Sequence, residues 1–437
     1  MKVPQWQESS LGEIAEYING RAFKPTEWEI EGVPIIRIQN LNNPTAVYNY
    51  YSKFLEEKYS VKHGDLLYAW SASLDSYIWR GGDACLNQHI FNVKPFAGIS
   101  KNFIFYLLKY VSADILSQTH GSGMVHITKG KFEKIKIFLP ALAEQHYLAD
   151  KLDSLLARIQ TLSDQLAAVP ALLKQFRQSV LADAVSGRLL NRGKNSNGWE
   201  EVKFGDVITS SGNGISKRKS DTGMDTTVLR LADFKDAERI TGNERQIQLS
   251  QKEIEQYVLK ENDLLVIRVN GSAELAGKFI LYKDMGLPEA YCDHFIRFRI
   301  DKNKLLPRYF LYVANSGEGR AYLRSSLSTS AGQNTINQTS IKNLIFKLPP
   351  LAEQTEIVRR VETLFALADD IEQQSRAAAE RVVLLTQSVL AKAFRGELSE
   401  QWRREHPDLI SGDNSAAALL ARIQAERAAT GKKSRRA

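Results

Sequence analysis

The segment Leu139-Pro140-Ala141-Leu142-Ala143-Glu144-Gln145 decides the organisation of this chain, because it recurs as Leu348-Pro349-Pro350-Leu351-Ala352-Glu353-Gln354. The two copies are 209 residues apart (348 − 139). Residues 178–184 return at the same spacing as residues 387–393, with no insertion or deletion in between. Such a long internal repeat indicates two tandem copies of one structural unit. The sequence therefore predicts two similar halves, and a target that also has two parts.

A heptad pattern follows each copy of the repeated segment. Apolar residues recur at alternating steps of four and three residues, which is the a/d seam of a coiled coil and is sustained too long for an ordinary surface helix. The two helices are expected to pair with each other in antiparallel orientation. The predicted seam consists of Leu148, Leu152, Leu155, Ile159, Leu162, Leu166, Val169, Leu173, Phe176 and Val180, and of Ile357, Val361, Leu364, Ile371, Val382, Leu385 and Val389, with the small residues Ala368, Ser375 and Ala378 in the second copy.

Each predicted helix is bounded by matching residues. Pro140 and Pro349 precede the helices, and Gly187 and Gly396 lie near their ends, where glycine commonly stops a helix. Pro170 interrupts only the first copy and predicts a kink or a break there, because proline removes a backbone donor inside a helix.

The sequence outside the helices has a mixed pattern of short β-rich runs and turns. Matching segments occur in both halves, but their spacing grows from 193 (204 − 11) through 198 (262 − 64) to 205 (294 − 89), so insertions collect in these parts. The predicted fold class is α+β, with two globular mixed α/β domains separated by two long helices that form an antiparallel coiled coil, a pseudo-twofold tandem repeat. The predicted boundaries are globular domains at 1–140 and 193–349, helical spacers at 141–192 and 350–400, and a partly disordered tail at 401–437.

The composition is that of a slightly basic protein with real hydrophobic cores. The net charge of +8 and the pI near 9.2 are compatible with a polyanionic partner, although part of the excess lies at the C-terminal end. Cys85 and Cys292 are too few and too far apart for a disulfide framework or a zinc site, and we interpret them as reduced core thiols. The N-terminus has no apolar signal region, and the chain has no run of 18 apolar residues. We expect a cytoplasmic protein that does not span a membrane.

The whole chain resembles the specificity (S) subunit of type I restriction–modification enzymes. The most specific stretches are residues 348–354, residues 388–398 and the segment from Gln401-Trp402-Arg403 through residues 407–410 to residues 425–427. The resemblance implies two target-recognition domains, here the globular domains, each reading one half of a bipartite asymmetric site in double-stranded DNA, with the helices fixing the gap. It also implies two modification subunits that bind S-adenosylmethionine and methylate adenine. In the full complex, two restriction subunits would add cleavage of unmodified DNA with ATP and Mg²⁺.

Sequence motifs for catalysis are missing, which agrees with a subunit that has no catalytic residue, metal ligand or cofactor of its own. We find no Gly-x-x-x-x-Gly-Lys-Ser/Thr phosphate loop, no Asn/Asp-Pro-Pro-aromatic motif and no His/Cys cluster with metal-ligand spacing. Two alternatives stay open at this point. The chain could be a self-sufficient DNA nuclease with an unrecognised carboxylate site, or a coiled-coil protein scaffold.

Candidate DNA-binding residues are those suited to phosphates or base edges. In the second module, the basic run 217–219 follows a glycine turn and suits phosphates, although a solvated charge run is an equal alternative. Residues 268–272 and 330–334 combine a guanidinium with amides and small residues, as base contacts require. The candidates are Lys217, Arg218, Lys219, Arg268, Asn270, Ser272, Gln333 and Asn334.

The first module offers a different set at matching places, so we expect its half-site to differ. These candidates are Arg21, Lys24, Arg37, Gln39, Asn40, Trp70, Ser71, Ser122 and His126. His89 and His294 occupy matching places beside apolar strands, and we interpret both as structural residues. Asp65 and Asp263 open matching Asp-Leu-Leu runs and are also interpreted as structural. With the seam buried between the helices, modification subunits are expected at the polar flanks and at each helix–module junction.

Overall fold

The computed structural model describes residues 3–43, 45–118, 127–190, 198–220, 222–235, 238–242 and 244–434. The chain forms two compact units, one from Met1–Ala167 with Ala377–Ala437 and the other from Ala168–Arg376. Each unit contains one globular module and a part of both long helices, so the repeat seen in the sequence is a repeat of structure.

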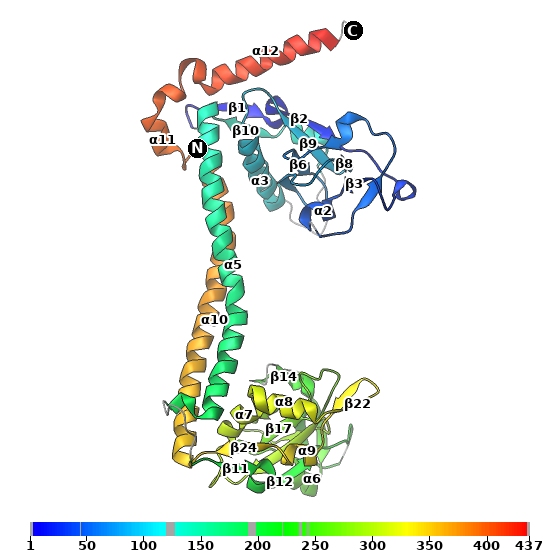
Figure 1. Ribbon diagram of the computed structural model, residues 1–437, viewed down its shortest axis with the longest axis vertical. Helices are drawn as coiled ribbons and strands as arrows, with labels where there is room; N and C mark the ends of the chain where they lie inside the picture. The colour runs from blue at the N-terminus through cyan, green and yellow to red at the C-terminus, as the bar shows by residue number, and fades with distance from the viewer. Residues whose placement is uncertain are drawn as a thin grey trace. The chain divides into compact units, whose positions relative to one another are not determined.

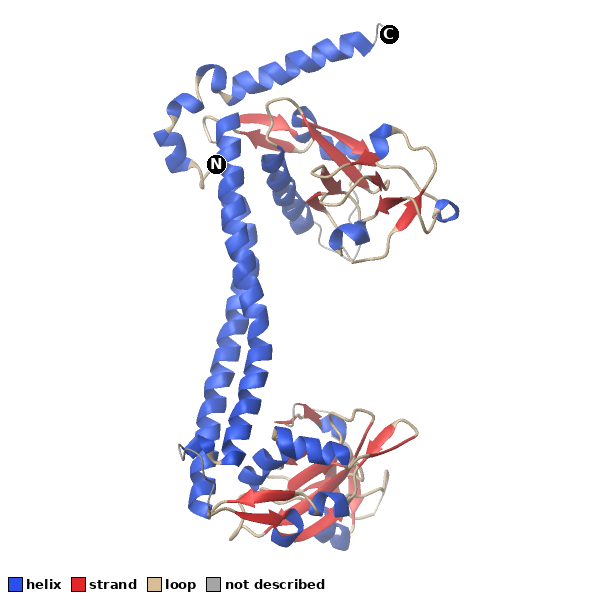
Figure 2. Cartoon of the chain, viewed as in Figure 1, coloured by secondary structure: helices blue, strands red, loops and turns tan. Residues whose placement is uncertain are grey.

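The described residues of the first module form three small sheets, which can be followed in Figures 1 and 2. In the central sheet, β2 (Ala15–Asn19), β9 (Ile90–Pro95), β6 (Leu66–Ala69) and β7 (Asp75–Ile78) lie side by side in that order. The second sheet has the order β4 (Asn49–Tyr51), β3 (Val33–Ile36), β8 (Ala84–Leu86) and β5 (Ser60–Val61). β1 (Gln7–Ser10) pairs antiparallel with β10 (Lys136–Leu139), which leads into the first long helix. The helices are α1 (Leu11–Ile14), α2 (Ile38–Asn42), α3 (Lys101–Gln118) and α4 (Lys129–Glu133).

The second module repeats this plan with additions. Its central sheet has the order β12 (Ile208–Asn213), β21 (Phe295–Ile300), β17 (Leu264–Ile267) and β19 (Phe279–Leu281), and β11 (Glu200–Lys203) pairs with β24 (Ile345–Leu348). Another sheet has the order β16 (Gln246–Leu249), β13 (Met224–Leu229) and β20 (Glu289–Tyr291). The additions are a hairpin of β14 (Phe234–Lys235) and β15 (Glu238–Arg239) and a sheet of β18 (Val269–Asn270), β23 (Gln333–Thr335) and β22 (Ser328–Ser330). The helices are α6 (Gln251–Tyr257), α7 (Pro307–Asn315), α8 (Gly317–Ser325) and α9 (Gln338–Lys342).

Aromatic side chains form the centre of each core. In the first module, the buried rings of Tyr17, Tyr68 and Phe132 pack with centroid distances of 5.1 Å for Tyr17–Phe132 and 4.7 Å for Tyr68–Phe132. In the second, Phe204 stacks on Phe310 at 3.8 Å. Both free cysteines, Cys85 and Cys292, are buried, which confirms their interpretation as core thiols.

The long helices α5 (Leu142–Ser186) and α10 (Leu351–Phe394) contain 45 and 44 residues. In the second unit, Arg177 of α5 forms ion pairs with Asp369 (2.6 Å) and Glu372 (2.9 Å) of α10. In the first unit, Leu148 and Leu152 share a core with Leu390 and Phe394. Early residues of α5 therefore meet late residues of α10, and late residues of α5 meet early ones, so the helices run antiparallel as predicted.

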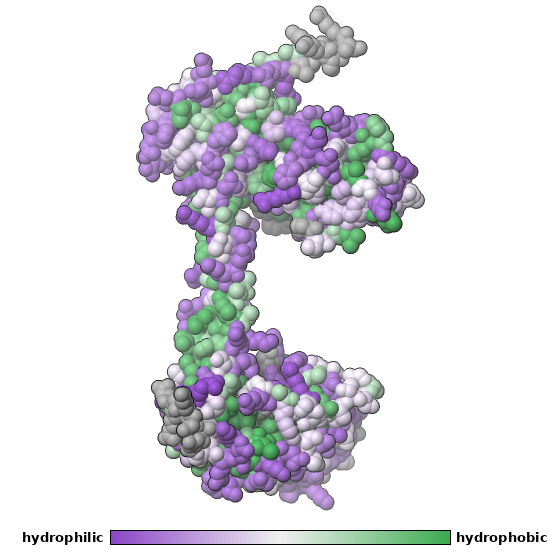
Figure 3. Space-filling model, in the orientation of Figure 1, coloured by the Kyte–Doolittle hydropathy of each residue, from purple (hydrophilic) through white to green (hydrophobic). Residues whose placement is uncertain are grey.

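The predicted seam is buried only in part. Leu148, Leu152, Leu173, Val180, Ile357, Val361 and Val382 are buried, whereas Leu162, Phe176, Ile371 and Leu385 are 36–47% exposed. Two paired helices cover only a narrow stripe of each other. In a straight helix, positions that repeat every seven residues also turn by about 20° per heptad around the helix axis, so the predicted seam turns away from the partner helix. Figure 3 accordingly shows apolar surface along the described part of the long helices.

Of the two outcomes predicted for Pro170, the break is wrong, because Pro170 lies inside α5 and contacts with α10 continue on both sides of it. The tail, for which partial disorder was predicted, forms α11 (Glu400–Glu405) and α12 (Ala416–Ser434) in the described residues. α12 lies along the first module (Figure 1), where Leu419 and Ile423 join the core and Arg427 donates to the Gly12 carbonyl at 3.1 Å. No helix in the described part of the chain is long and apolar enough to cross a membrane.

Candidate nucleic-acid interface

Matching aspartates set the start of the central strands β6 and β17. Asp65 accepts hydrogen bonds from the Lys62 N–H (3.0 Å) and Lys94 Nζ (2.7 Å). Asp263 accepts from the Lys260 N–H (2.9 Å) and, through both carboxylate oxygens, from Arg299. Burial opposes ionisation of Asp65, but these donors outweigh it and lower the pKa of its carboxyl group. Both aspartates therefore hold the turns in place, and the candidate residues of the loops lie at the other end of these strands.

The residues that follow β6 and β17 occupy the same position in both modules. The Trp70 N–H donates to the His89 carbonyl at 3.2 Å, and the Arg268 N–H donates to the His294 carbonyl at 2.7 Å. The same backbone position therefore carries an indole in one module and a guanidinium in the other. The two modules thus differ in chemistry at one equivalent position.

In the second module, the structure brings the predicted basic residues together around Asp293. Arg218 forms an ion pair with the Asp293 carboxylate at 3.3 Å, and Arg268 Nη1 donates to the Asp293 carbonyl at 3.3 Å. Lys217 pairs with Glu253 at 3.2 Å, and Lys219 is exposed. The run 217–219 is thus not a loose charged loop, because two of its three side chains are held by ion pairs.

The amide-rich segments of the second module also meet. β18 pairs with β23, with Asn270 opposite Asn334, and Asn334 Nδ2 donates to the Gly271 carbonyl at 2.9 Å. Asn270 Oδ1 accepts from the Ser272 N–H at 2.8 Å. Gln333 and Ser272 remain exposed. The polar candidates in this module therefore form one surface, with Gln333, Ser272 and the guanidinium of Arg218 open to a ligand.

In the first module, the arginine candidates are stacked on aromatic rings. The Arg21 guanidinium lies 4.8 Å from the ring centroids of both Phe23 and Tyr51 and pairs with Glu27. Arg37 lies 4.9 Å from the Trp28 ring, and its Nη1 donates to Asn49 Oδ1 at 3.2 Å. Lys24 and Gln39 are exposed. A planar guanidinium held in this way keeps its charge and a defined orientation for phosphate or base contacts.

Several candidates in the first module do not fit a DNA-contacting role. Asn40 is 2% exposed; its Oδ1 accepts from the Arg37 N–H, and its Nδ2 donates to the carbonyls of Ala46 and Val47. It caps a short helix instead. Ser71 is also buried, and Trp70 is half-buried with its ring stacked on Phe91 at 5.7 Å. Ser122 and His126 lie outside the described residues.

Three further polar residues of these loops were not among the candidates predicted from the sequence. Gln88 and Asp293 occupy the turn that ends at the two matching histidines, and Arg245 has Nε and Nη2 atoms that are buried without a hydrogen-bond partner. The repeat of residues 89–91 as residues 294–296 identifies this turn in the sequence. Gln88 and Asp293 directly precede the repeated segment and could have been found from it.

The donor atoms of Cys292, Asp293 and His294 lie within 4.8 Å of one another. Such a cluster could in principle hold a metal ion, which prefers a deprotonated thiolate. Burial instead raises the pKa of the Cys292 thiol, and the Arg218 guanidinium already neutralises the Asp293 carboxylate. These residues therefore fit a cation poorly.

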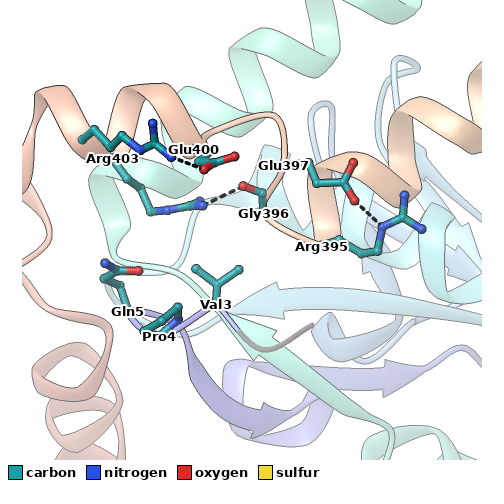
Figure 4. Close-up of a pocket in the computed structure, with 9 residues that line it drawn as sticks. Val3, Pro4, Gln5, Arg395, Gly396, Glu397, Glu400 and Arg403 are labelled. Atoms are coloured by element: carbon teal, nitrogen blue, oxygen red, sulfur yellow. Dashed lines mark hydrogen bonds and ion pairs between the residues drawn. The ribbon is translucent and has the colours of Figure 1, made fainter.

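A cavity of about 650 Å³ lies between the N-terminal segment and the end of α10 (Figure 4). Its arginine side chains already have partners. Arg395 pairs with Glu397 at 2.7 Å, Arg404 pairs with Glu400, and Arg403 Nη2 donates to the Gly396 carbonyl at 2.7 Å. The cavity thus belongs to the attachment of the tail and offers little free charge to a nucleic acid.

Together, the duplicated fold and its two unlike polar loop surfaces define a protein of two similar modules with different candidate DNA-binding residues. The family model described as type I restriction modification DNA specificity domain matches residues 4–171 and 196–381. The chain belongs to this family of type I restriction–modification specificity subunits, which recognise DNA targets and are not catalytic themselves. The comparisons give no support to the nuclease or scaffold alternatives.

Curated relatives of the chain match it over nearly its whole length. The chain is 47% identical to the type I restriction enzyme StySPI specificity subunit of Salmonella potsdam, over 99% of this chain and 98% of the relative. It is 34% identical to the EcoKI specificity subunit of Escherichia coli (strain K12), again over 99% and 98%. Among solved structures, the HsdS subunit from Thermoanaerobacter tengcongensis aligns with a TM-score of 0.57 and 18% identity, over 90% of this chain and 97% of that chain. This last similarity shows the fold alone.

Proposed function

We propose that this chain reads a bipartite, asymmetric DNA site, with one module on each half, and that the paired helices fix the unread gap. The observation that carries the proposal is the matched backbone of the two modules: the same hydrogen bond to a histidine carbonyl is made by the half-buried Trp70 in one module and by Arg268 in the other. One scaffold used twice with different side chains is suited to two different short sequences. The helices of 45 and 44 residues are suited to a spacer.

The proposal includes two modification subunits as partners, which would supply S-adenosylmethionine and methylate adenine in the cytoplasm. Two restriction subunits would add ATP- and Mg²⁺-dependent cleavage of unmodified DNA. Support for two equivalent docking sites comes from apolar residues that remain exposed on the helices. Leu162 and Leu385 in the first unit are 47% and 44% exposed, and Ile371 and Phe176 in the second are 41% and 36% exposed.

These exposed residues are related by the repeat. Leu162 corresponds to Ile371 (371 − 162 = 209), and Phe176 corresponds to Leu385 (385 − 176 = 209). The ion pairs of Arg177 with Asp369 and Glu372 fix the helix register next to Phe176 and Ile371, which adjoin these residues in the sequence. Equivalent apolar pairs favour two copies of one partner, because the same surface recurs on a pseudo-twofold frame.

The helix–module junctions offer a second pair of equivalent surfaces. One groove, with a volume of about 750 Å³, is lined by Leu107, Ile137 and Phe394. The other, of about 360 Å³, is lined by Val313, Phe346 and Val185. Phe346 and Phe394 stand 209 residues after Ile137 and Val185 (346 − 137; 394 − 185). We therefore extend the proposed docking surface from the helices to these junctions, rather than to the polar flanks.

Mapping of methylated bases tests the DNA part of the proposal. The chain is co-expressed with the modification subunit of its own system in a host without other methylation, and the methylated adenines are located by sequencing. We expect one motif with two unlike halves around a constant gap. Methylation without a sequence motif, or a motif with a single continuous block, would contradict it.

Native mass spectrometry of the purified complex tests the partner part. The wild-type chain is expected to carry two modification subunits, and Leu385→Asp and Phe176→Asp are each expected to lose one of them. The exposed Gln387 and Gln178 lie on the same helices, so Gln387→Asp and Gln178→Asp serve as charge-matched controls. Two bound subunits in both apolar-to-Asp variants would show that the docking surface lies elsewhere.

A further inference from the structure

One turn makes the same backbone hydrogen bonds in both modules. It comprises residues 87–89 in the first module and 292–294 in the second, and we call it the central turn. The N–H groups of Gln88 and Asp293 donate to the carbonyls of Arg21 and Ile215, each at 3.0 Å. The N–H groups that open the turn donate to Ile36 (3.2 Å) and Leu229 (3.0 Å). The carbonyls of His89 and His294 accept from Trp70 and Arg268, as described above.

These hydrogen bonds place the central turn where the candidate DNA segments converge. In the second module, it is bonded to the strand end that precedes Arg230, to the segment that leads into Lys217 and to the backbone of Arg268. In the first module, it is bonded in the same way to the residue before Arg37, to Arg21 and to Trp70. No other described backbone turn joins these three segments in both modules.

The side chains in the middle of the central turn are not needed to hold it, because the backbone bonds are the same for two different residues. Gln88 is exposed, and its Nε2 lies 3.1 Å from the ring nitrogen of the adjacent His89. Asp293 is 27% exposed, and its carboxylate is balanced by Arg218, which is 55% exposed. An exposed arginine can leave such a pair for a nearby phosphate without moving the backbone of the turn.

From this juxtaposition we infer that Gln88 and Asp293 are equivalent specificity-determining residues, each of which contacts one base edge in its own half-site. The glutamine amide both donates and accepts, which matches adenine N7 and N6 in the major groove. The carboxylate only accepts, which matches the amino group of cytosine. The inference rests on the proposed reading of one half-site by each module and adds the residue that distinguishes the halves.

Exchange of the two residues tests the inference in the assembled complex. Gln88→Asp and Asp293→Gln are each co-expressed with the modification subunit, and the methylated motif is mapped as for the wild type. We expect each variant to change one base position, with the two changes in different halves of the motif. Binding of the purified complexes to the wild-type site should fall by about 5- to 150-fold, while a site with the new base should recover affinity.

The closer replacements Gln88→Glu and Asp293→Asn keep the side-chain shape and give the answer if an exchanged variant does not fold. Asp225→Asn, an exposed carboxylate on β13 of the same module, controls for the change in charge. An unchanged motif in all variants, or an equal loss of affinity for every DNA sequence, would overturn the inference. Absence of a two-part motif in the wild-type complex would instead count against the proposed function, so the two failures are distinguishable.

Discussion

Gln354 accepts a hydrogen bond from the backbone N–H of Leu306 through Oε1, at 2.7 Å. Its Nε2 donates to the carbonyls of Pro349 (2.8 Å) and Lys304 (2.9 Å). In the other half, Gln145 Oε1 accepts from the Ser100 N–H at 2.9 Å, and its Nε2 donates to the Pro140 carbonyl at 3.0 Å. The repeated Glu-Gln pair therefore ends in a buried amide that ties each long helix to the first helix after the central sheet, and this is where the two halves of the sequence agree best.

Replacing either glutamine with alanine should destabilise its own unit. Gln354→Ala leaves the partly buried Leu306 N–H and two carbonyls without this partner, and Gln145→Ala does the same to the buried Ser100 N–H and to the Pro140 carbonyl. Each unpaired buried group typically costs about 1–3 kcal/mol. Hydrogen exchange should show faster opening at the start of α7 in the first variant and of α3 in the second. The exposed Gln387 and Gln178 are also related by the repeat, and their alanine variants should change little.

The other residue of the repeated pair has a different partner in each half, which gives a second prediction. Glu144 is buried and accepts from Arg403 Nη1 and Ser399 Oγ, both at 2.6 Å, whereas Glu353 accepts from Trp199 Nε1 at 2.9 Å. Arg403→Ala leaves a buried carboxylate without its cation, a change that commonly costs about 3–5 kcal/mol. Trp199→Phe removes one neutral donor and should cost less.

Thermal unfolding and limited trypsin digestion check this difference. Arg403→Ala should lower the melting temperature and expose the tail, with early cleavage at Arg422 and Arg427 of α12. Trp199→Phe should leave that cleavage pattern unchanged. A tail that stays protected in Arg403→Ala would show that the burial of Leu419 and Ile423 is sufficient to hold it.

Sequence reasoning found the framework of this protein more easily than its loops. The heptad spacing and the repeated Leu-Pro segment predicted α5 and α10 nearly to their ends, because long helices depend on local periodicity. The break that was predicted as one outcome at Pro170 is absent from α5, because the contacts of a helix with its partner can outweigh one missing hydrogen bond. The predicted burial of Leu162 and Leu385 was wrong because a periodic pattern does not reveal how many neighbouring elements cover the apolar face of a helix.

The loop surfaces depend on contacts between distant segments, which composition does not reveal. Asn40 has a residue type suited to bases, but its backbone partners lie six and seven residues away in a folded loop. Arg218 and Asp293 are 75 residues apart and meet only through the sheet. The sequence could therefore predict which segments carry the candidate residues, but it could not predict whether each side chain is exposed.

The buried cysteines give a prediction about chemical reactivity. Burial raises the pKa of the Cys85 thiol from 9.0 to about 11 and also raises that of Cys292. The reactive thiolate is therefore scarce in the folded chain at pH 8. A thiol reagent such as DTNB should label the native protein slowly and both cysteines rapidly in denaturant. Fast labelling of one cysteine in the native protein would show that its surroundings open easily.

The raised pKa of Cys85 also affects the free energy of unfolding at high pH. Between pH 9 and about pH 11, the unfolded chain has lost the Cys85 proton while the folded chain keeps it. The folded state then binds more protons, so this contribution to stability falls as the pH rises through that window. Cys85→Ala should reduce the loss between pH 9 and pH 11 relative to the wild type, as measured by urea unfolding at each pH.

Replacing Pro170 should raise the stability of the protein, unlike the substitutions above that lower it. Proline in a helix interior lacks the N–H donor and is about 3 kcal/mol less favourable than alanine. Pro170→Ala should therefore stabilise α5, by about 1–3 kcal/mol if part of the strain is already relaxed. Ala171→Gly, at the neighbouring exposed position, should destabilise by about 1 kcal/mol and serves as the control. A lower melting temperature for Pro170→Ala would mean that the contacts between α5 and α10 require the proline geometry.

Arg268 and Lys219 should differ in how they contribute to DNA binding. Arg268 is held at the central turn by its backbone and by a single long hydrogen bond from its side chain, and we expect its guanidinium to contact a base edge. Arg268→Ala should relax one position of one half-site by about 1–3 kcal/mol. The exposed Lys219 suits a phosphate, and Lys219→Ala should weaken binding to all sequences and reduce the slope of log affinity against log salt by about 0.9.

Titrations of the modification complex with wild-type and single-base variant sites at several salt concentrations measure both quantities. An equal loss on all sites for Arg268→Ala, with a smaller salt slope, would make it a phosphate contact and would leave Asp293 as the base-reading residue of that turn.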